Sequence, residues 1–282
     1  MTQAVPTPEP LPEIHLVAVD LDGTLLNDAK QVTDRTAAAF KGLPERGVKV
    51  VIASARPPRS VRHIYKLLNL DTWQINYNGA LIWDEPNQTP VFHRPLGKGV
   101  ARRIIDDARF LFGHVQVTCE ILDKWYTDRF DPTNTTETGR LFKPDVVAPL
   151  DTFCDAQVTK LLLLSDPHTI SMLEYAITQA HNGIEGEEIT CLRADDNLIQ
   201  IMDRRVSKAT ALQIVAKQYG VRMRNVMAIG DAPNDVAMLQ VAGVAVAMDN
   251  AHPLVKRVSH WVAPSNNDHG VHAALVKYGL CD

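Results

Sequence analysis

A pair of acidic residues near the start of the chain has the spacing for chemistry with a metal ion. Asp20 and Asp22 stand one residue apart in the segment 20–24, Asp-Leu-Asp-Gly-Thr. Two carboxylates this close are costly unless a cation binds between them, and Mg²⁺ typically takes one or two carboxylates plus substrate phosphate. A carboxylate beside such a metal can also attack phosphorus as a nucleophile. The pair therefore favours metal-assisted phosphoryl transfer over an acidic turn in which Gly23 supplies a positive φ.

Two further segments offer groups that bind phosphate. Ser54 follows the apolar run 50–53, and a hydroxyl near a helix start can donate to a phosphate oxygen. Taken alone, Ser54 fits a plain helix cap better. Lys208 follows Ser207, and an isolated lysine is usually a charged surface residue. If Lys208 faces the carboxylates and a bound phosphate, its ammonium would neutralise negative charge during phosphoryl transfer.

The segment 230–235, Gly-Asp-Ala-Pro-Asn-Asp, carries a second set of acidic residues. Asp231 comes directly after an apolar run and is a candidate metal ligand. Asn234 and Asp235 fall on the first turn of the next expected helix, where capping and acidic side chains interact favourably with the helix dipole. Helix capping does not account for Asp231, so this segment also indicates a metal site.

The elements that must position these residues alternate between strand and helix at both ends of the chain. Apolar runs predict buried strands, and amphipathic spacing predicts the helices between them. The helices are expected from Thr33 to near Gly47, after Pro57, and from Ser207 to Gly220. The strands are expected at 15–19, 48–53, 226–229 and 244–248. This alternation predicts an α/β fold with a doubly wound parallel sheet, in which ligands bind at the carboxyl ends of the strands. All four polar segments follow such strands, so they can meet in one cleft.

The middle of the chain has a different pattern and indicates an inserted domain. It reads as α+β, with strands at 114–118, 124–127, 158–164, 189–192 and 198–201, and a helix at 169–180. We predict a Pro-rich flexible tail at 1–13, a core of 14–84 plus 200–282, and an inserted cap at 85–199.

Composition excludes several classes of protein. Hydrophobic residues make up 45% and charged residues 22% of the 282, which is ordinary for a folded protein. The net charge of 29 − 33 = −4 argues against binding to nucleic acid or to an anionic membrane. No long apolar run, secretory signal or paired-cysteine motif is present. We therefore expect a cytoplasmic protein with reduced thiols, no membrane partner and no nucleic-acid partner.

The four segments, in this order, resemble the motifs of the haloacid dehalogenase superfamily. The segment 20–24 matches its D-x-D-G-T motif, Ser54 its Ser/Thr motif, Lys208 its lysine motif, and 230–235 its G-D-x-x-N-D motif. The long insert, together with 78–80, 246–251 and 266–271, resembles the Cof-like type IIB sugar-phosphatase group. The chain departs from that group at Ala55 and Asp249, where glycine is common, and neither change removes a functional group.

The resemblance implies a role for each motif residue. Asp20 would be the nucleophile and Asp22 the general acid and base. Mg²⁺ would be held by Asp20, Asp231 and the backbone carbonyl of Asp22. Ser54 and Lys208 would hold the transferring phosphoryl group, with Asn234 and Asp235 in support. It also implies a Rossmann-like core with a type C2B cap that selects the substrate.

The leading interpretation is a Mg²⁺-dependent hydrolase of phosphoric monoesters that acts on a sugar phosphate or similar small metabolite through an aspartyl-phosphate. A phosphomutase of the same superfamily, or a phosphate-binding protein without catalytic activity, are the alternatives. The substrate and the oligomeric state are left open by the sequence.

Overall fold

The computed structural model describes residues 13–131, 142–181 and 188–282. The predicted tail at 1–13 lies outside these ranges except for Glu13. The described residues divide into two compact units. The first takes the described residues up to Ile52, with Lys66–Thr72 and Leu212–Asp282, and the second takes those of Ala53–Tyr65 and Trp73–Ala211. In these ranges no helix is both long and apolar enough to cross a membrane.

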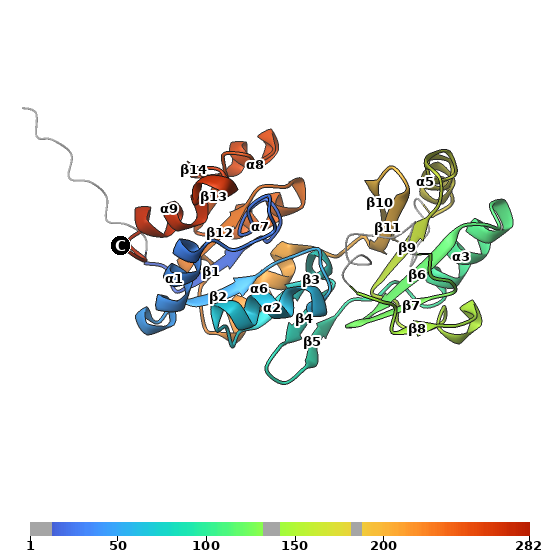
Figure 1. The fold of residues 1–282 in the computed structure, drawn as a ribbon, viewed down its shortest axis with the longest axis horizontal. Coiled ribbons are helices and arrows are strands. Elements are labelled where there is room, and N and C mark those ends of the chain that lie inside the picture. Colours follow the sequence, from blue (N-terminus) through green and yellow to red (C-terminus); the bar gives the residue numbers. More distant parts are fainter. Residues whose placement is uncertain (1–12, 132–141, 182–187) are drawn as a thin grey trace, which may run out of the picture. The chain divides into compact units, whose positions relative to one another are not determined.

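The first unit is built on a five-stranded parallel sheet in the order β14-β13-β12-β1-β2. Its strands are β1 (Leu16–Val19), β2 (Lys49–Ile52), β12 (Val226–Gly230), β13 (Val244–Met248) and β14 (Trp261–Ala263). Every residue of β1, β12 and β13 is buried, which explains why each reads as a continuous apolar run. In the register, Val19 lies between Ile229 and Ile52, so β1, β2 and β12 end side by side (Figure 1).

The strand order reverses at β1, and this confirms the doubly wound sheet. From β1 the chain passes through α1 (Asp34–Gly42) to β2 on one side. From β12 it passes through α7 (Val236–Val241) to β13 and through α8 (Pro253–Val258) to β14 on the other side. Right-handed crossovers that run in opposite directions place their helices on opposite faces of a sheet. In agreement, α1 packs with α9 (Gly270–Lys277), and α7 packs with α8.

Helix α1 is shorter than the sequence predicts. Thr33 is its N-cap and accepts from the amide of Thr36, as expected. The helix ends at Gly42, because Pro44 has no N–H to continue the α-helical ladder. A 3₁₀ turn at Pro44–Arg46 follows, and Gly47, with φ of +72°, then reverses the chain.

The second unit contains two sheets that are largely antiparallel. The six-stranded sheet has the order β10-β11-β9-β6-β7-β8, in which only β7 and β8 are parallel, and a three-stranded sheet joins β3, β4 and β5. The strands are β3 (Trp73–Asn76), β4 (Leu81–Asp84), β5 (Thr89–His93), β6 (Gln116–Ile121), β7 (Lys124–Thr127), β8 (Val146–Val147), β9 (Lys160–Leu164), β10 (Ile189–Asp195) and β11 (Leu198–Asp203).

One apolar cluster holds the six-stranded sheet and its helices together. Helices α3 (Val100–Leu111) and α5 (Pro167–His181) both contribute to it, together with inward-facing residues of β6, β9 and β11 (Figure 1). Ile104 of α3, Leu173 of α5 and Leu161 of β9 are fully buried members of this cluster. This is the predicted α+β character of the middle of the chain.

Two helices, α2 (Pro58–Leu68) and α6 (Lys208–Gln218), contribute residues to both units. The sheet of β3, β4 and β5 and helix α3 were not anticipated from the sequence. Residue 85 lies in the turn between β4 and β5, which pair with each other. The proposed cap at 85–199 stays a prediction.

Candidate active site

Asp20 lies at the position where the order of the parallel strands reverses. It follows β1 directly, and its amide donates to the carbonyl of Ile229 at 2.9 Å, which extends the pairing with β12 by one residue. The residue is only 6% exposed. Ligands of doubly wound sheets bind at this switch point, outside the carboxyl ends of the strands. Asp20 therefore stands where the fold class places a reactive group.

Two further carboxylates join Asp20 at the end of β12. Asp20, Asp231 and Asp235 each offer a carboxylate oxygen, and these three oxygens lie within 4.8 Å of one another. Asp235 is fully buried, and its Oδ2 accepts from the amides of Asp231 and Ala232, both at 3.0 Å. These two bonds fix the turn that carries Asp231. The sequence placed Asp235 only in a supporting role, whereas its carboxylate belongs to the acidic cluster itself.

Two glycines allow the carboxylates to approach this closely. Gly23 has φ of +77°, and a Cβ at this position would overlap the Oδ2 of Asp231. A Cβ on Gly230 would lie 2.6 Å from the Cγ of Asp235. Both motif glycines are therefore required by the packing around the cluster, and Gly23 is required by its backbone conformation as well.

Asp22 has different surroundings from Asp20. Its side chain is 37% exposed, and its Oδ1 forms an ion pair with the Nζ of Lys30 at 2.9 Å. Its carboxylate is not a member of the acidic cluster of described residues. This arrangement is compatible with the expectation that the backbone carbonyl of Asp22, rather than its side chain, faces a metal.

Ser54 and Lys208 both lie in the second unit and are both buried, at 1% exposure. The Oγ of Ser54 accepts from the amide of Arg56 at 3.1 Å, and α2 begins only at Pro58. Ser54 therefore shapes the loop before the helix and is not its N-cap. Lys208 is the first residue of α6, and burial of its ammonium is unlike an ordinary surface lysine.

The segment Tyr77–Gly79 lies between Ser54 and Lys208. The amide of Asn78 donates to the carbonyl of Ser54 at 3.0 Å. Gly79, with φ of +101°, packs so tightly on the Ser207 carbonyl that a Cβ would overlap it. This segment thus places the two candidate phosphate-binding residues against one common loop.

Several residues that support the acidic site were not assigned a role from the sequence. Thr24 donates through Oγ1 to the Oδ1 of Asp231 at 2.7 Å. The side chain of Asn250 donates to the carbonyl of Gly23 at 2.8 Å and accepts from the amide of Asn266 at 3.0 Å. Thr24, Asn250 and Asn266 all stand in the segments that carry the family resemblance, which was the only signal for them. Asn234, by contrast, is exposed in the 3₁₀ turn Pro233–Asp235.

The donor set of the acidic cluster fits Mg²⁺. It consists of carboxylate oxygens, which are hard ligands. Two oxygens on one Mg²⁺ are separated by at most about 4.2 Å, twice the usual bond length of ~2.1 Å. The observed bound of 4.8 Å comes close to that separation, and modest side-chain rotation would close the difference.

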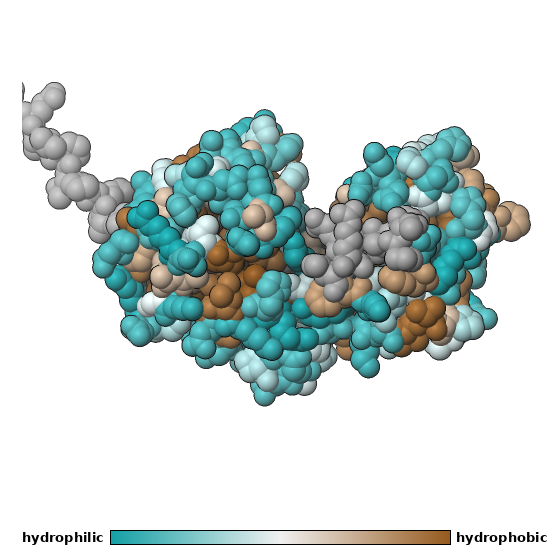
Figure 2. Space-filling model, in the orientation of Figure 1, coloured by the Kyte–Doolittle hydropathy of each residue, from teal (hydrophilic) through white to brown (hydrophobic). Residues whose placement is uncertain are grey.

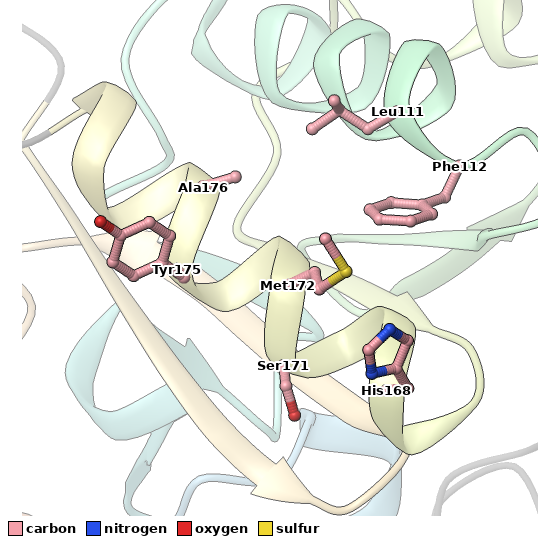
Figure 3. Close-up of a pocket in the computed structure, with 7 residues that line it drawn as sticks. All are labelled: Leu111, Phe112, His168, Ser171, Met172, Tyr175 and Ala176. Atoms are coloured by element: carbon pink, nitrogen blue, oxygen red, sulfur yellow. The ribbon is translucent and has the colours of Figure 1, made fainter.

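A pocket in the second unit is lined by none of the motif residues. It has a volume of about 400 Å³ and lies between the end of α3 and the outer face of α5 (Figure 3). Its lining is almost entirely apolar and consists of Leu111, Phe112, His168, Ser171, Met172, Tyr175 and Ala176. The face drawn in Figure 2 is largely hydrophilic, with hydrophobic residues showing in smaller patches between the hydrophilic ones. An apolar lining does not suit a phosphate group, so we assign the pocket no part in the chemistry.

Comparisons with known proteins agree with the motifs. A family profile of haloacid dehalogenase-like hydrolases matches residues 17–275. A 5-amino-6-(5-phospho-D-ribitylamino)uracil phosphatase of Bacillus subtilis, YitU, is 29% identical over 275 residues, which cover 94% of this chain and 97% of the relative. The phosphatase YwpJ of the same organism is 28% identical over an alignment of 288 residues, which covers 95% of this chain and all of the relative.

A solved structure shares the fold over most of this chain. The subclass IIB sugar phosphatase BT4131 superimposes with a TM-score of 0.74, over 94% of this chain and 99% of that chain. The two sequences are 16% identical, so this likeness is one of fold.

Proposed function

The chain belongs to the haloacid dehalogenase-like hydrolases, and from that premise we propose that it is a Mg²⁺-dependent phosphatase of small phosphomonoesters. The observation that carries the proposal is the group of three carboxylates, Asp20, Asp231 and Asp235, at the reversal of strand order. The relatives YitU and YwpJ are named as phosphatases, which supports the same class of reaction.

In the first half-reaction, Asp20 attacks the phosphorus atom. A bond forms between a carboxylate oxygen of Asp20 and phosphorus, the ester P–O bond breaks, and Asp22 gives its proton to the departing oxygen. In the second half-reaction, Asp22 takes a proton from water as that water attacks the aspartyl-phosphate. Phosphate leaves, and the carboxylate of Asp20 is restored. The exposure of Asp22 supports this role, because a group that gives and takes a proton in each cycle must be reached by water.

Ser54 and Lys208 bind the oxygens of the transferring phosphoryl group in this proposal. The hydroxyl of Ser54 donates a hydrogen bond, and the ammonium of Lys208 balances the charge on the phosphate. Their common contact with the Tyr77–Gly79 segment supports a joint role. Asn234 and Asp235 are proposed as supporting residues.

Asp20, Asp231 and the backbone carbonyl of Asp22 would hold Mg²⁺, and the carboxylate of Asp235 lies within reach of the same position. When bound, the ion supplies positive charge that offsets the negative charge on the phosphoryl oxygens and on the acidic cluster.

We propose a sugar phosphate or a similar phosphorylated metabolite as the substrate. YitU, named for a phosphorylated ribityl compound, supports a substrate with a sugar-like chain. We further propose that the protein acts in the cytoplasm, without a nucleic-acid or membrane partner. A panel of sugar phosphates, nucleotides and the ribitylaminouracil phosphate would rank the candidates by kcat/KM.

Metal removal tests the reaction class. We expect EDTA to abolish phosphate release and added Mg²⁺ to restore it. Asp231→Asn should lose the response to Mg²⁺, whereas the exposed Lys277→Met should behave as the unmodified protein. Full turnover in a metal-free preparation would refute metal dependence. A requirement for a sugar bisphosphate activator, with no release of free phosphate, would instead favour a mutase.

A further inference from the structure

The loop that carries Ser54 is held through the backbone carbonyls of three successive residues. The carbonyl of Ser54 accepts from the amide of Asn78 at 3.0 Å, and that of Arg56 accepts from the amide of Tyr77 at 3.3 Å. The carbonyl of Ala55 accepts from the Nζ of Lys160 at 3.5 Å, the longest of the three hydrogen bonds. Lys160 is 105 residues away in the sequence, at the start of β9.

Lys160 is a buried ammonium in a charged and aromatic setting. The residue is 7% exposed, and its Nζ lies 5.2 Å from the centre of the Tyr77 ring, a cation–π contact. Glu120 of β6 is its partner in the strand register. The carboxylate of Glu120 accepts from the Nη2 of Arg59 at 2.7 and 2.8 Å, and from the hydroxyl of Tyr77 at 3.1 Å. Glu120 is therefore hydrogen-bonded to Arg59 and Tyr77, while the Nζ of Lys160 contacts the carbonyl of Ala55 in the loop.

The start of α2 is attached to the same region of the six-stranded sheet. The amide of Arg59 donates to Asp123 at 2.7 Å, and Arg62 donates to the second oxygen of the same carboxylate at 2.8 Å. Asp123 lies in the turn between β6 and β7. The segment 54–57 is thus fixed by the Tyr77–Gly79 segment and by this turn, and Lys160 contacts it between those anchors.

We propose that Lys160 is a positioning residue, whose ammonium holds the Ala55 carbonyl and thereby fixes Ser54 for binding of the phosphoryl group. The inference rests on the proposed phosphatase function, because that function gives Ser54 its role. A displacement of about 1 Å at a reacting group costs on the order of 10²-fold in rate, so a residue behind the site can matter to turnover.

The cost of burying this charge supports a positioning role. Burial lowers the pKa of Lys160 from 10.5 to about 8, while Glu120 acts to raise it and Arg59 to lower it. The groups that face the ammonium are Glu120 from β6, Arg59 from α2 and Tyr77 from the segment before β4. Burial and the nearby Glu120 raise the pKa of the Tyr77 hydroxyl. An apolar side chain would be cheaper to bury, so stability alone does not explain a lysine here.

The test compares Lys160→Met, which removes the ammonium but keeps the length of the side chain, with Lys160→Arg, which keeps the charge. Lys277→Met is the matched control, because Lys277 also lies over an aromatic ring, at 5.1 Å from Trp261, but is exposed. The readouts are kcat and KM for p-nitrophenyl phosphate and the inhibition constant of inorganic phosphate, each from pH 6.5 to 9.5.

We expect Lys160→Met to lower kcat/KM by roughly 10- to 100-fold and to weaken inhibition by phosphate in parallel. In the unmodified protein, phosphate inhibition should weaken above about pH 8, as the ammonium loses its proton. This change should be absent in Lys160→Met and displaced to higher pH in Lys160→Arg, since the guanidinium stays charged.

Wild-type values of kcat, KM and phosphate inhibition in a folded Lys160→Met protein would overturn the inference. If that variant does not fold, an unmoved pH dependence in Lys160→Arg would overturn it equally. Failure of the proposed function looks different, because the unmodified protein would then neither release phosphate from any substrate nor bind inorganic phosphate.

Discussion

The two carboxylates of the first motif are one residue apart but differ in their access to water. Asp20 is almost fully buried at the end of β1, whereas the side chain of Asp22 is 37% exposed and paired with Lys30. A nucleophile benefits from protection from water, and a proton-transfer group needs exchange with it. Their surroundings therefore support the division of roles proposed for them.

This division can be tested by substituting each carboxylate separately. Asp20→Asn removes the nucleophile, so no phosphorylated protein should form. Asp22→Ala removes proton transfer, which typically contributes about 10²–10⁴-fold, and should slow turnover of alkyl phosphates by that factor. An activated aryl phosphate needs little protonation of its leaving group, so formation of the aspartyl-phosphate is slowed less in Asp22→Ala. Its hydrolysis still lacks the general base, so the aspartyl-phosphate should accumulate on this variant. Rapid quench with labelled phosphate and acid precipitation would detect it. Label on Asp20→Asn, or normal turnover by Asp22→Ala, would contradict the assignment.

The close contact between Gly23 and Asp231 yields a second residue-scale prediction. Gly23→Ala and Gly220→Ala each place a side chain at a positive φ, +77° and +67°, at a cost of about 1–2 kcal/mol. Gly220 has open space around its Cα, so that cost is its whole effect. Gly23→Ala must also displace the Asp231 carboxylate and should weaken Mg²⁺ affinity.

Chemical denaturation would measure the stability of the two variants, and a Mg²⁺ titration of activity would measure affinity. The expected result is similar destabilisation from the backbone conformation in both, with a higher Mg²⁺ requirement only in Gly23→Ala. Equal Mg²⁺ requirements would show that the contact between Gly23 and Asp231 does not control the metal site.

At the scale of elements, β9 and β6 present charged residues to the start of α2. Lys160 and Glu120 are register partners on these two strands, and Arg59 belongs to the helix. Removing one partner of a buried ion pair typically costs about 3–5 kcal/mol, because the other charge remains buried. The ion pair between Arg59 and Glu120 therefore stabilises the second unit. Of these three charged residues, Lys160 is the one that contacts the loop of Ser54.

The lowered pKa of Lys160 predicts how stability varies with pH. Between about pH 8 and 10.5 the unfolded chain holds a proton that the folded chain has released, so this group makes the free energy of unfolding rise with pH. Below about pH 8 both states are protonated, and the burial penalty of roughly 3 kcal/mol is present in full. Lys160→Met should therefore gain most in stability, relative to the unmodified protein, at pH 7, and this gain should shrink towards pH 10.

Denaturation of both proteins at pH 7, 8.5 and 9.5 would measure this gain. Lys277→Met provides the baseline for losing an exposed lysine, and its difference from the unmodified protein should not vary over the same range. A gain for Lys160→Met that stays constant with pH would show that the ammonium is not held at a burial cost.

At the scale of the whole molecule, the described chain forms two compact units, and the candidate groups are divided between them. Asp20, Asp231 and Asp235 belong to the first unit, and Ser54 and Lys208 to the second. The metal site is thus complete within one unit, and its affinity should be measurable without any substrate.

Mg²⁺ should therefore raise the thermal stability of the intact protein. At about 100 times its dissociation constant, a ligand that binds only the folded state adds roughly 2.7 kcal/mol. We expect a rise in Tm on adding Mg²⁺ that is lost in Asp231→Asn and kept in Lys277→Met. An undiminished rise in Asp231→Asn would place the ion elsewhere.

The sequence by itself determined the parallel strands and the polar groups at their ends. Apolar runs such as 226–229 and 244–248 specify buried strands because every side chain in them must avoid water, and the motif residues follow within one or two positions. Local spacing is enough for such features, since strand, turn and motif lie within a few residues of each other.

Only the tertiary structure decided which distant residues meet. The sheet of β3, β4 and β5, the approach of Gly23 to Asp231, the place of Asp235 in the acidic cluster and the contact of Lys160 with Ala55 were not foreseen. These features depend on strand order and on side chains up to about two hundred positions apart. Hydrophobic periodicity reports which face of an element is buried and carries no information about its partner.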